Sequence, residues 1–278
     1  MARYDGDVHA RCLFSAAIII VTAATSDALA GSPQVRPGGV VRWPGSGVTA
    51  CSVGGREWAP LAGACYFPVD LEAKGTLRVT RTAAGRRESR EITVGRYPYA
   101  EQRLTLPDTM VNLSPEDQAR VARESARVAP LWRLEGPARF VLPLGPPLKE
   151  LASNRRFGAR RVLNGTPRSP HGGEDYRAAA GTPALAPGDG VVALAEEQFY
   201  AGNAVYLDHG GGLVTMLFHL SRIDVKAGDQ VQRGQVVGVV GATGRATGPH
   251  LHFGVRWHGN RVDPAILLAK SPDVVELR

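Results

Sequence analysis

The residues best suited to chemistry are four histidines and one aspartate in the C-terminal half of this 278-residue chain. His171 and Asp175 stand in the run S-P-H-G-G-E-D-Y, His219 in T-M-L-F-H-L-S, and His250 and His252 in T-G-P-H-L-H-F. Imidazole and carboxylate groups are ligands that hold a catalytic Zn²⁺ while one coordination position stays open for water. The set therefore predicts the centre of a hydrolase.

Spacing places these side chains on shared faces of extended chain. His250 and His252 are two residues apart, so both side chains project from one face of a strand. His171 and Asp175 are four apart, and this even separation also puts them on one face if the local chain is extended. Glu174 would then point to the opposite face, so it is not assigned as a general base.

Two further histidines lack such partners. His209, in L-D-H-G-G-G, is predicted to cap a glycine turn, and His258, in W-H-G-N, is predicted to be an exposed hairpin tip. A lone histidine is more often a satisfied core or surface residue than a ligand. The combination H-x-x-x-D plus H-x-H is more specific, because each half already suggests a ligand pair.

The elements that must position these residues are predicted to be short strands. The chain has 33 Gly and 20 Pro, which favours a mainly β protein. From about residue 139 the pattern is one of strands separated by glycine turns, and the segments 184–192 and 225–231 echo each other. Such runs make tight antiparallel turns, with glycine where a positive φ is needed.

Residues 31–100 are predicted to form a separate β-sandwich-like module. Polar and apolar residues alternate over 76–80 and 92–94, and Gly85 lies in the polar segment that would join them as a hairpin. Cys51 and Cys65 are an even pair in a chain that we expect to be exported, which suggests one disulfide. No histidine stands near either cysteine, so both are interpreted as structural.

A helical connector is predicted over residues 101–138, before a catalytic domain at 139–278. Its clearest element is a helix at 114–129, with Ser114 as the N-cap and proline at the first helical position. One face carries Val121, Ser125, Val128 and Trp132. The opposite, arginine-bearing face is interpreted as solvated; an amphipathic helix that binds a membrane is the less favoured alternative.

Residues 1–30 are predicted to be a signal peptide. An apolar stretch over 13–24 is followed by an A-x-A cleavage site at 28–30, which favours a periplasmic or secreted location. Asp5 and Asp7 are atypical there and leave an uncleaved membrane anchor as the alternative. No other run of about eighteen apolar residues exists, so no stable membrane span is expected after cleavage.

Charge gives a weaker indication of partners. The net charge of +7 would suit an anionic polymer such as cell wall or nucleic acid. The chain has no concentrated basic run, and an exported protein meets the wall first. Peptidoglycan peptide stems are therefore the expected partner, nucleic acid is not, and a monomer is expected.

The motifs together resemble a known family. H-G-G-E-D-Y, G-T-P-A-L-A-P-G-D-G-V-V, G-N-A-V-Y-L-D-H-G-G-G, H-L-S, V-K-A-G-D-Q-V-Q-R-G-Q and T-G-P-H-L-H-F occur in this order over roughly residues 150–268. They resemble the M23 zinc metallopeptidases, the lysostaphin- or LytM-like cell-wall endopeptidases. The N-terminal β module and helix resemble the layout of exported Gram-negative members. The resemblance implies a C-terminal antiparallel β-sheet domain of the LytM type.

The resemblance also implies roles for the five residues. His171, Asp175 and His252 match the zinc ligands, with a fourth position left for water. His219 and His250 match the two histidines that do not ligate the metal. Their implied roles are to take or relay the proton of the attacking water and to stabilise the oxyanion.

Two positions depart from the family pattern. Leu217 stands where members often have tyrosine, two residues before the H-L-S histidine, and Gly254 stands where glutamate is common. Neither position is a ligand. The departures therefore bear on how the substrate fits rather than on zinc binding.

Three hypotheses for function follow. The first is a zinc endopeptidase that cuts peptide cross-links of peptidoglycan, and the resemblance implies the D-alanyl–diaminopimelate bond. The second is a non-catalytic LytM-like regulator that binds the wall or activates amidases; such proteins lose ligands, and this chain shows no such loss. The third is a biotinyl- or lipoyl-type carrier, which needs a lysine at a hairpin tip. No lysine occurs between Val192 and Asp224, so the carrier is excluded.

Overall fold

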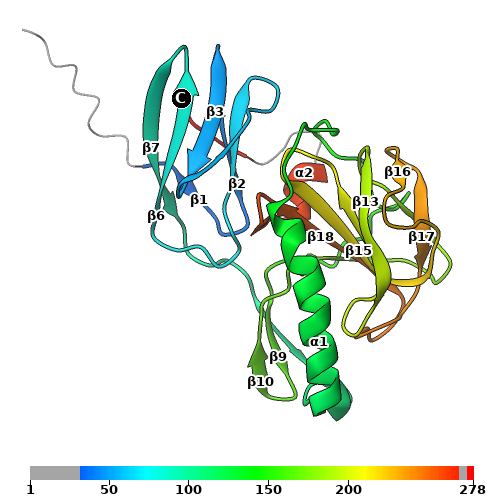
Figure 1. Cartoon of the computed structure of the whole chain (residues 1–278). Coiled ribbons are helices and arrows are strands. Elements are labelled where there is room, and N and C mark those ends of the chain that lie inside the picture. The colour runs from blue at the N-terminus through cyan, green and yellow to red at the C-terminus, as the bar shows by residue number, and fades with distance from the viewer. Residues whose placement is uncertain (1–31, 269–273) are drawn as a thin grey trace, which may run out of the picture. The chain divides into compact units, whose positions relative to one another are not determined.

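The computed structural model describes residues 32–268 and 274–278, so the predicted signal peptide lies outside the described residues. The predicted mainly β class is confirmed, since antiparallel sheets dominate and α1 is the long helix (Figure 1). In this part of the chain, no helix is both long and apolar enough to span a membrane. Residues 32–278 group as one unit, and the predicted boundaries at about 100 and 138 stay predictions.

The N-terminal strands form two sheets around one buried cluster. Trp43, Phe67 and Ile92 lie in this cluster and are almost fully buried. The five-stranded sheet contains β1 (Gln34–Val35), β7 (Arg86–Val94), β6 (Thr76–Ala83), β3 (Val48–Val53) and β4 (Arg56–Trp58), in that order. The other contains β20 (Val275–Glu276), β2 (Val40–Pro44) and β5 (Ala64–Pro68).

Both local predictions for this region are confirmed. Ala84 and Gly85 have φ values of 48° and 73° and join β6 to β7, as a two-residue hairpin requires. Cys51 in β3 and Cys65 in β5 form a disulfide with a Cα–Cα distance of 5.5 Å. The disulfide therefore links the two sheets.

The chain returns to this region at its C-terminus. β20 pairs in parallel with β2, with Val275 opposite Val41, and the Leu277 side chain is buried in the N-terminal cluster. Two residues are too few to carry a strand pattern of their own. The local sequence therefore gave no basis for predicting this pairing.

The connector contains β8 (Glu101–Leu104), the short 3₁₀ segments η1 (Asp108–Met110) and η2 (Ala129–Arg133), and α1 (Pro115–Val128). The predicted N-cap is confirmed, since the Ser114 hydroxyl accepts a hydrogen bond from the Asp117 amide at 3.1 Å. β8 pairs in parallel with β9 (Arg160–Leu163), which pairs with β10 (Thr166–Arg168). The connector thus shares a sheet with residues assigned to the catalytic domain.

The prediction of a solvated charged face on α1 is correct for Arg123 and Arg127, which are exposed, but wrong for Glu124. Glu124 is only 8% exposed and accepts hydrogen bonds from Arg120 Nε and from the Phe199 amide. Arg127 pairs with Glu196 on β13 (Gly190–Gln198). Phe199 and Glu196 lie about seventy residues away from the helix along the chain, so helical periodicity alone could not reveal these two contacts. Figure 1 shows α1 as the long green helix.

A nine-stranded sheet carries the candidate catalytic residues. Its main path has the order β11-β18-β15-β14-β13-β16, β17 pairs with β12 and β15, and β19 pairs with β18. Besides β13, its strands are β11 (Gly173–Arg177), β12 (Pro183–Leu185), β14 (Gly202–Asp208), β15 (Leu213–Ile223), β16 (Gln230–Val231), β17 (Val236–Val240), β18 (His250–Trp257) and β19 (Asn260–Arg261). The short helix α2 (Pro264–Leu268) follows. Leu217, Phe253 and Trp257 lie in the buried core of this sheet.

The two echoing segments lie beside each other in this sheet. Ala184 pairs with Gly238, and Gly190 pairs with Val231, both in antiparallel register. Gly228, just before β16, has a φ of 91°, as predicted for a tight glycine turn.

The exposure predicted for His258 and the capping role predicted for His209 are wrong, although His258 does lie in the hairpin turn between β18 and β19. His258 is 5% exposed and stacks on Trp58 with ring centroids 4.1 Å apart, so it is a buried contact and not an exposed tip. His209 is fully buried between the Asp189 carbonyl and the Thr215 hydroxyl. The Asp208 carboxylate caps the glycine turn instead, by accepting a hydrogen bond from the Gly210 amide.

Candidate active site

Three neighbouring strands bring the five candidate residues together. β11 and β18 are antiparallel with Asp175 opposite His252, and β15 lies on the other side of β18 with Phe218 opposite His252. His171 lies two residues before β11. The even spacings seen in the sequence therefore place His171, Asp175 and His252 at one position of the sheet.

The donor atoms of these three residues converge. His171 Nε2 lies 2.9 Å from His252 Nδ1 and 3.1 Å from Asp175 Oδ1, and His252 Nδ1 lies 2.9 Å from Asp175 Oδ1. Metal–ligand bonds of about 2.0–2.2 Å in a tetrahedron place ligand atoms roughly 3.3 Å apart. The triangle of donors is slightly smaller than this, and its chemistry of two imidazoles and one carboxylate fits zinc.

Their surroundings favour the protonation states that metal binding needs. Burial lowers the pKa of His171 to about 4, which keeps its ring neutral at pH 7. Burial alone would raise the pKa of Asp175, but its close contacts with the His171 and His252 rings outweigh burial and hold that pKa well below its usual range. A neutral imidazole and an ionised carboxylate are the forms that ligate a metal.

His219 and His250 lie beside this triangle. The ring centroids of the two are 4.8 Å apart, and His219 lies 5.9 Å from His252 by the same measure. His219 Nδ1 donates to the Thr243 carbonyl at 2.9 Å, and His250 Nδ1 donates to the Gly248 carbonyl at 2.8 Å. Since a carbonyl can only accept, each Nδ1 carries a proton, and Nε2 is the nitrogen that each ring has left for another partner.

The backbone at His219 is unusual. His219 has a φ of 63°, which is uncommon outside glycine, and the β14–β15 register shifts between Asn203 and Val205. The shift sets Phe218 and His219 against Ala204 as a bulge, a device that re-aims side chains near active sites. Burial, followed by the charges of His252 and His250, lowers the pKa of His219 to about 3. The imidazole is therefore neutral at pH 7, and its Nε2 has a lone pair that can accept a hydrogen bond.

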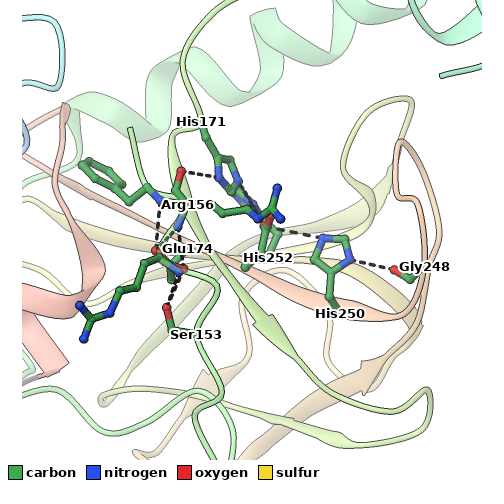
Figure 2. A network of polar contacts seen from close by, with 10 residues as sticks. Ser153, Arg156, His171, Glu174, Gly248, His250 and His252 are labelled. Atoms are coloured by element: carbon green, nitrogen blue, oxygen red, sulfur yellow. Dashed lines mark hydrogen bonds and ion pairs between the residues drawn. The ribbon is translucent and has the colours of Figure 1, made fainter. Parts of the chain in front are cut away.

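Glu174 accepts several buried hydrogen bonds that the sequence did not predict. Its side chain is 3% exposed and accepts hydrogen bonds from Ser153 Oγ at 2.7 Å and from the amides of Arg156 and Phe157 at 3.0 and 3.1 Å. The Arg156 carbonyl in turn accepts from His171 Nδ1 at 3.0 Å (Figure 2). Glu174 therefore fixes the segment that orients the His171 ring.

We expect Glu174→Ala to weaken zinc binding by about 10- to 100-fold, the usual effect of losing a group that orients a ligand. Glu174→Gln should lose less zinc affinity, since the amide oxygen of glutamine can still accept a hydrogen bond. Competition with a chromogenic chelator measures the affinity. Asp263→Asn, at a buried carboxylate bonded to Arg36 and the Ala265 amide, serves as the control. Equal zinc affinity in Glu174→Ala and wild type would contradict this role.

Buried histidines also predict how stability depends on pH. Burial is the first cause of the lowered pKa values of His171, His209, His219 and His258. Below the unfolded value of 6.5 the unfolded chain therefore binds more protons than the fold. The free energy of unfolding of metal-free protein should fall from pH 6.5 toward about 4, by up to about 1.4 kcal/mol per pH unit for each histidine. Urea denaturation in the presence of chelator at pH 7.5, 6.5 and 5.0 tests this; a flat profile would contradict it.

Comparisons with known proteins agree with this geometry. The model of the family described as peptidase family M23 matches residues 169–264, which include all five residues. A crystal structure described as a peptidase M23 from Pseudomonas aeruginosa is 34% identical, covers 84% of this chain and 94% of that one, and superposes with a TM-score of 0.67.

Two curated relatives match a shorter segment. Peptidoglycan DD-endopeptidase ShyA of Vibrio cholerae serotype O1 is 45% identical over 108 residues, which are 38% of this chain and 25% of ShyA. DD-carboxypeptidase/endopeptidase Mpg of Neisseria meningitidis serogroup B is 41% identical over 106 residues, 38% of this chain and 24% of Mpg. The chain thus spans about a quarter of the length of these relatives.

Proposed function

Because the chain belongs to peptidase family M23, we propose that it is a zinc-dependent endopeptidase that hydrolyses peptide cross-links of peptidoglycan. One observation carries the proposal: three donor atoms that fit zinc lie within 3.1 Å of one another, and two more histidines lie beside them. A zinc peptidase needs both a metal site and a proton acceptor, and this arrangement has candidates for both.

The proposed roles follow from the environment of each side chain. His171, Asp175 and His252 would hold the zinc, which when bound acidifies water and polarises the scissile carbonyl. His219 takes the proton of the attacking water at Nε2, because its Nδ1 is committed to the Thr243 carbonyl. His250, whose Nδ1 is held likewise by the Gly248 carbonyl, would stabilise the developing oxyanion through a hydrogen bond from its Nε2, in the form of the ring that carries a proton on both nitrogens.

The proposed bond is the D-alanyl–diaminopimelate cross-link. Support comes from the names of ShyA, a DD-endopeptidase, and Mpg, a DD-carboxypeptidase/endopeptidase. The proposed location is the periplasm or the exterior, where this substrate lies and where the predicted signal peptide would direct the chain.

Digestion of purified sacculi tests the proposal. Zinc-loaded protein should convert cross-linked dimeric muropeptides into monomers, as resolved by chromatography and mass spectrometry. Unchanged dimers with one bound zinc per chain would contradict the peptidase function. Faster peptide release by an added amidase, without any cleavage by this protein alone, would favour the regulator instead.

A further inference from the structure

We propose that arginines beside the catalytic cluster, centred on Arg161 and Arg245, form a subsite for a carboxylate of the substrate peptide. The proposal rests on the proposed peptidase function and specifies that the enzyme recognises a negative charge on its substrate. It assigns a binding role to residues outside the five that carry out the chemistry.

The subsite lies in a groove of about 730 Å³ that also contains the histidine–aspartate cluster. β8 and β9 form one wall, with Gln102 paired to Arg161 and Leu104 paired to Leu163 in parallel register. Alternate residues of a strand share a face, so a polar pair and an apolar pair line the same groove. Arg161 belongs to the polar pair.

The groove is strongly basic. The arginines that line it are Arg156, Arg161, Arg177, Arg245, Arg256 and Arg261, whereas its acidic residues are Glu124 and Asp175. Glu124 accepts hydrogen bonds from Arg120 and from the Phe199 amide, and Asp175 accepts from the histidine ligands. Both carboxylates are therefore already engaged. Arg261 is also paired, with Asp70 and Glu72, so the excess positive charge that favours an anionic ligand comes from the other arginines.

Arg161 lacks a compensating partner. Among the described residues, Arg161 has no salt bridge, and its buried Nε has no hydrogen-bond partner; the same holds for the buried Oε1 of Gln102. Burial, against the attraction of Asp175 and together with the charges of Arg245 and Arg156, lowers the pKa of Arg161 to about 10. An unpaired charge in such a place is costly, and a bound anion would offset that cost.

Arg245 is held in position next to the reacting residues. Its guanidinium lies over the Tyr200 ring at 4.1 Å from the centroid, and its amide donates to the Tyr200 carbonyl at 2.9 Å. It stands five residues before His250 in a loop that lines the groove. A stacked guanidinium still offers its edge donors, which match the two oxygens of a carboxylate.

Cross-linked peptide stems supply such a ligand, because they carry free carboxylates near the amide that joins them. Amidation of those carboxylates keeps the shape and removes the charge. The subsite therefore predicts that the protein distinguishes the free acid from its amide, with Arg161 responsible for the difference.

Binding measured without turnover tests this. In a His219→Ala background with zinc bound, a soluble cross-linked stem peptide should bind about 10- to 100-fold more tightly than its amidated form. Adding Arg161→Gln should weaken binding of the free acid by a similar factor and leave the amidated peptide unaffected. Arg161→Lys keeps the charge but loses the bidentate hydrogen-bond geometry. Its affinity for the free acid should therefore lie between those of the arginine and glutamine forms.

Arg103→Gln is the matched control. Arg103 is an exposed neighbour of Gln102 on the same strand, pairs with Glu101, and does not line the groove. Arg103→Gln changes the net charge by the same amount as Arg161→Gln, and it should change neither the affinity for the free acid nor that for the amidated peptide. Zinc content and the melting temperature of each variant report its folding.

Equal affinity of wild type for the acid and the amide would overturn the proposal, and so would an equal loss for both peptides in Arg161→Gln. The first comparison needs no arginine variant, so it holds even if Arg161→Gln does not fold. If the acid is preferred but wild-type protein cleaves neither peptide, the subsite stands and the proposed peptidase function fails.

Discussion

Replacing His252 with alanine is expected to remove bound zinc and peptidase activity together. His252 Nδ1 lies 2.9 Å from both His171 Nε2 and Asp175 Oδ1, so its loss leaves two donors where catalytic zinc needs three. The zinc dissociation constant should rise by more than the roughly 100-fold upper range found for groups that only orient a ligand. Zinc per chain after dialysis, measured by mass spectrometry, gives the first result, and sacculus digestion gives the second.

His258→Asn is the control for this variant. His258 is also buried, but it packs against Trp58 and Glu135 and contacts none of the five candidate residues. Its φ of 47° is one that asparagine adopts readily, so the turn should be kept. The control should retain full zinc even if its melting temperature falls. Full zinc in His252→Ala would show that the ligand set is wrong.

Replacing His219 with alanine is expected to separate metal binding from catalysis. His219 contributes no atom to the donor triangle, so zinc content should equal that of wild type. Its neutral ring is the proposed proton acceptor, and general base catalysis contributes about 10²- to 10⁴-fold. The value of kcat/KM on a cross-linked peptide should fall by that factor, mainly through kcat.

His250→Ala provides an independent comparison. The same side-chain loss at the neighbouring ring should also keep the zinc and lower kcat. A His219→Ala variant that binds zinc fully and cleaves at the wild-type rate would remove the proposed base. Loss of zinc in that variant would instead place His219 among the ligands.

The chemistry of the site could be predicted because its residues occur in short sequence motifs. H-x-x-x-D and H-x-H each fit within five residues, and the two-residue period of a strand converts them into shared faces. Asp175 opposite His252 is the pairing that this logic requires, and the structure has it. The family resemblance divided the residues into proposed ligands and proposed catalysts, which spacing alone could not do.

Other features depend on contacts between distant segments. Glu124 is buried because residues of β13 and the Phe199 amide meet α1, and no pattern within the helix reports that contact. The same is true of His258, whose ring stacks on a tryptophan two hundred residues earlier. The sharing of a groove by Arg161 and the catalytic cluster likewise follows from the pairing of β8 with β9.

The backbone conformation at His219 also could not be predicted from the sequence pattern. The run T-M-L-F-H-L-S has no glycine or proline, yet the strand contains a bulge with a positive φ at the histidine. A sequence rich in β-forming residues predicts only a continuous strand. A residue held in this conformation by its surroundings is more common at functional sites than elsewhere.

The most direct test of the central claim uses one defined substrate. A synthetic peptide dimer with a single D-alanyl–diaminopimelate cross-link is incubated with protein that carries one zinc per chain, and the products are weighed by mass spectrometry. We expect two monomers whose summed mass exceeds that of the dimer by one water, and no product from His219→Ala beyond its slow residual rate. An intact dimer in the presence of the zinc-loaded wild-type protein would contradict it.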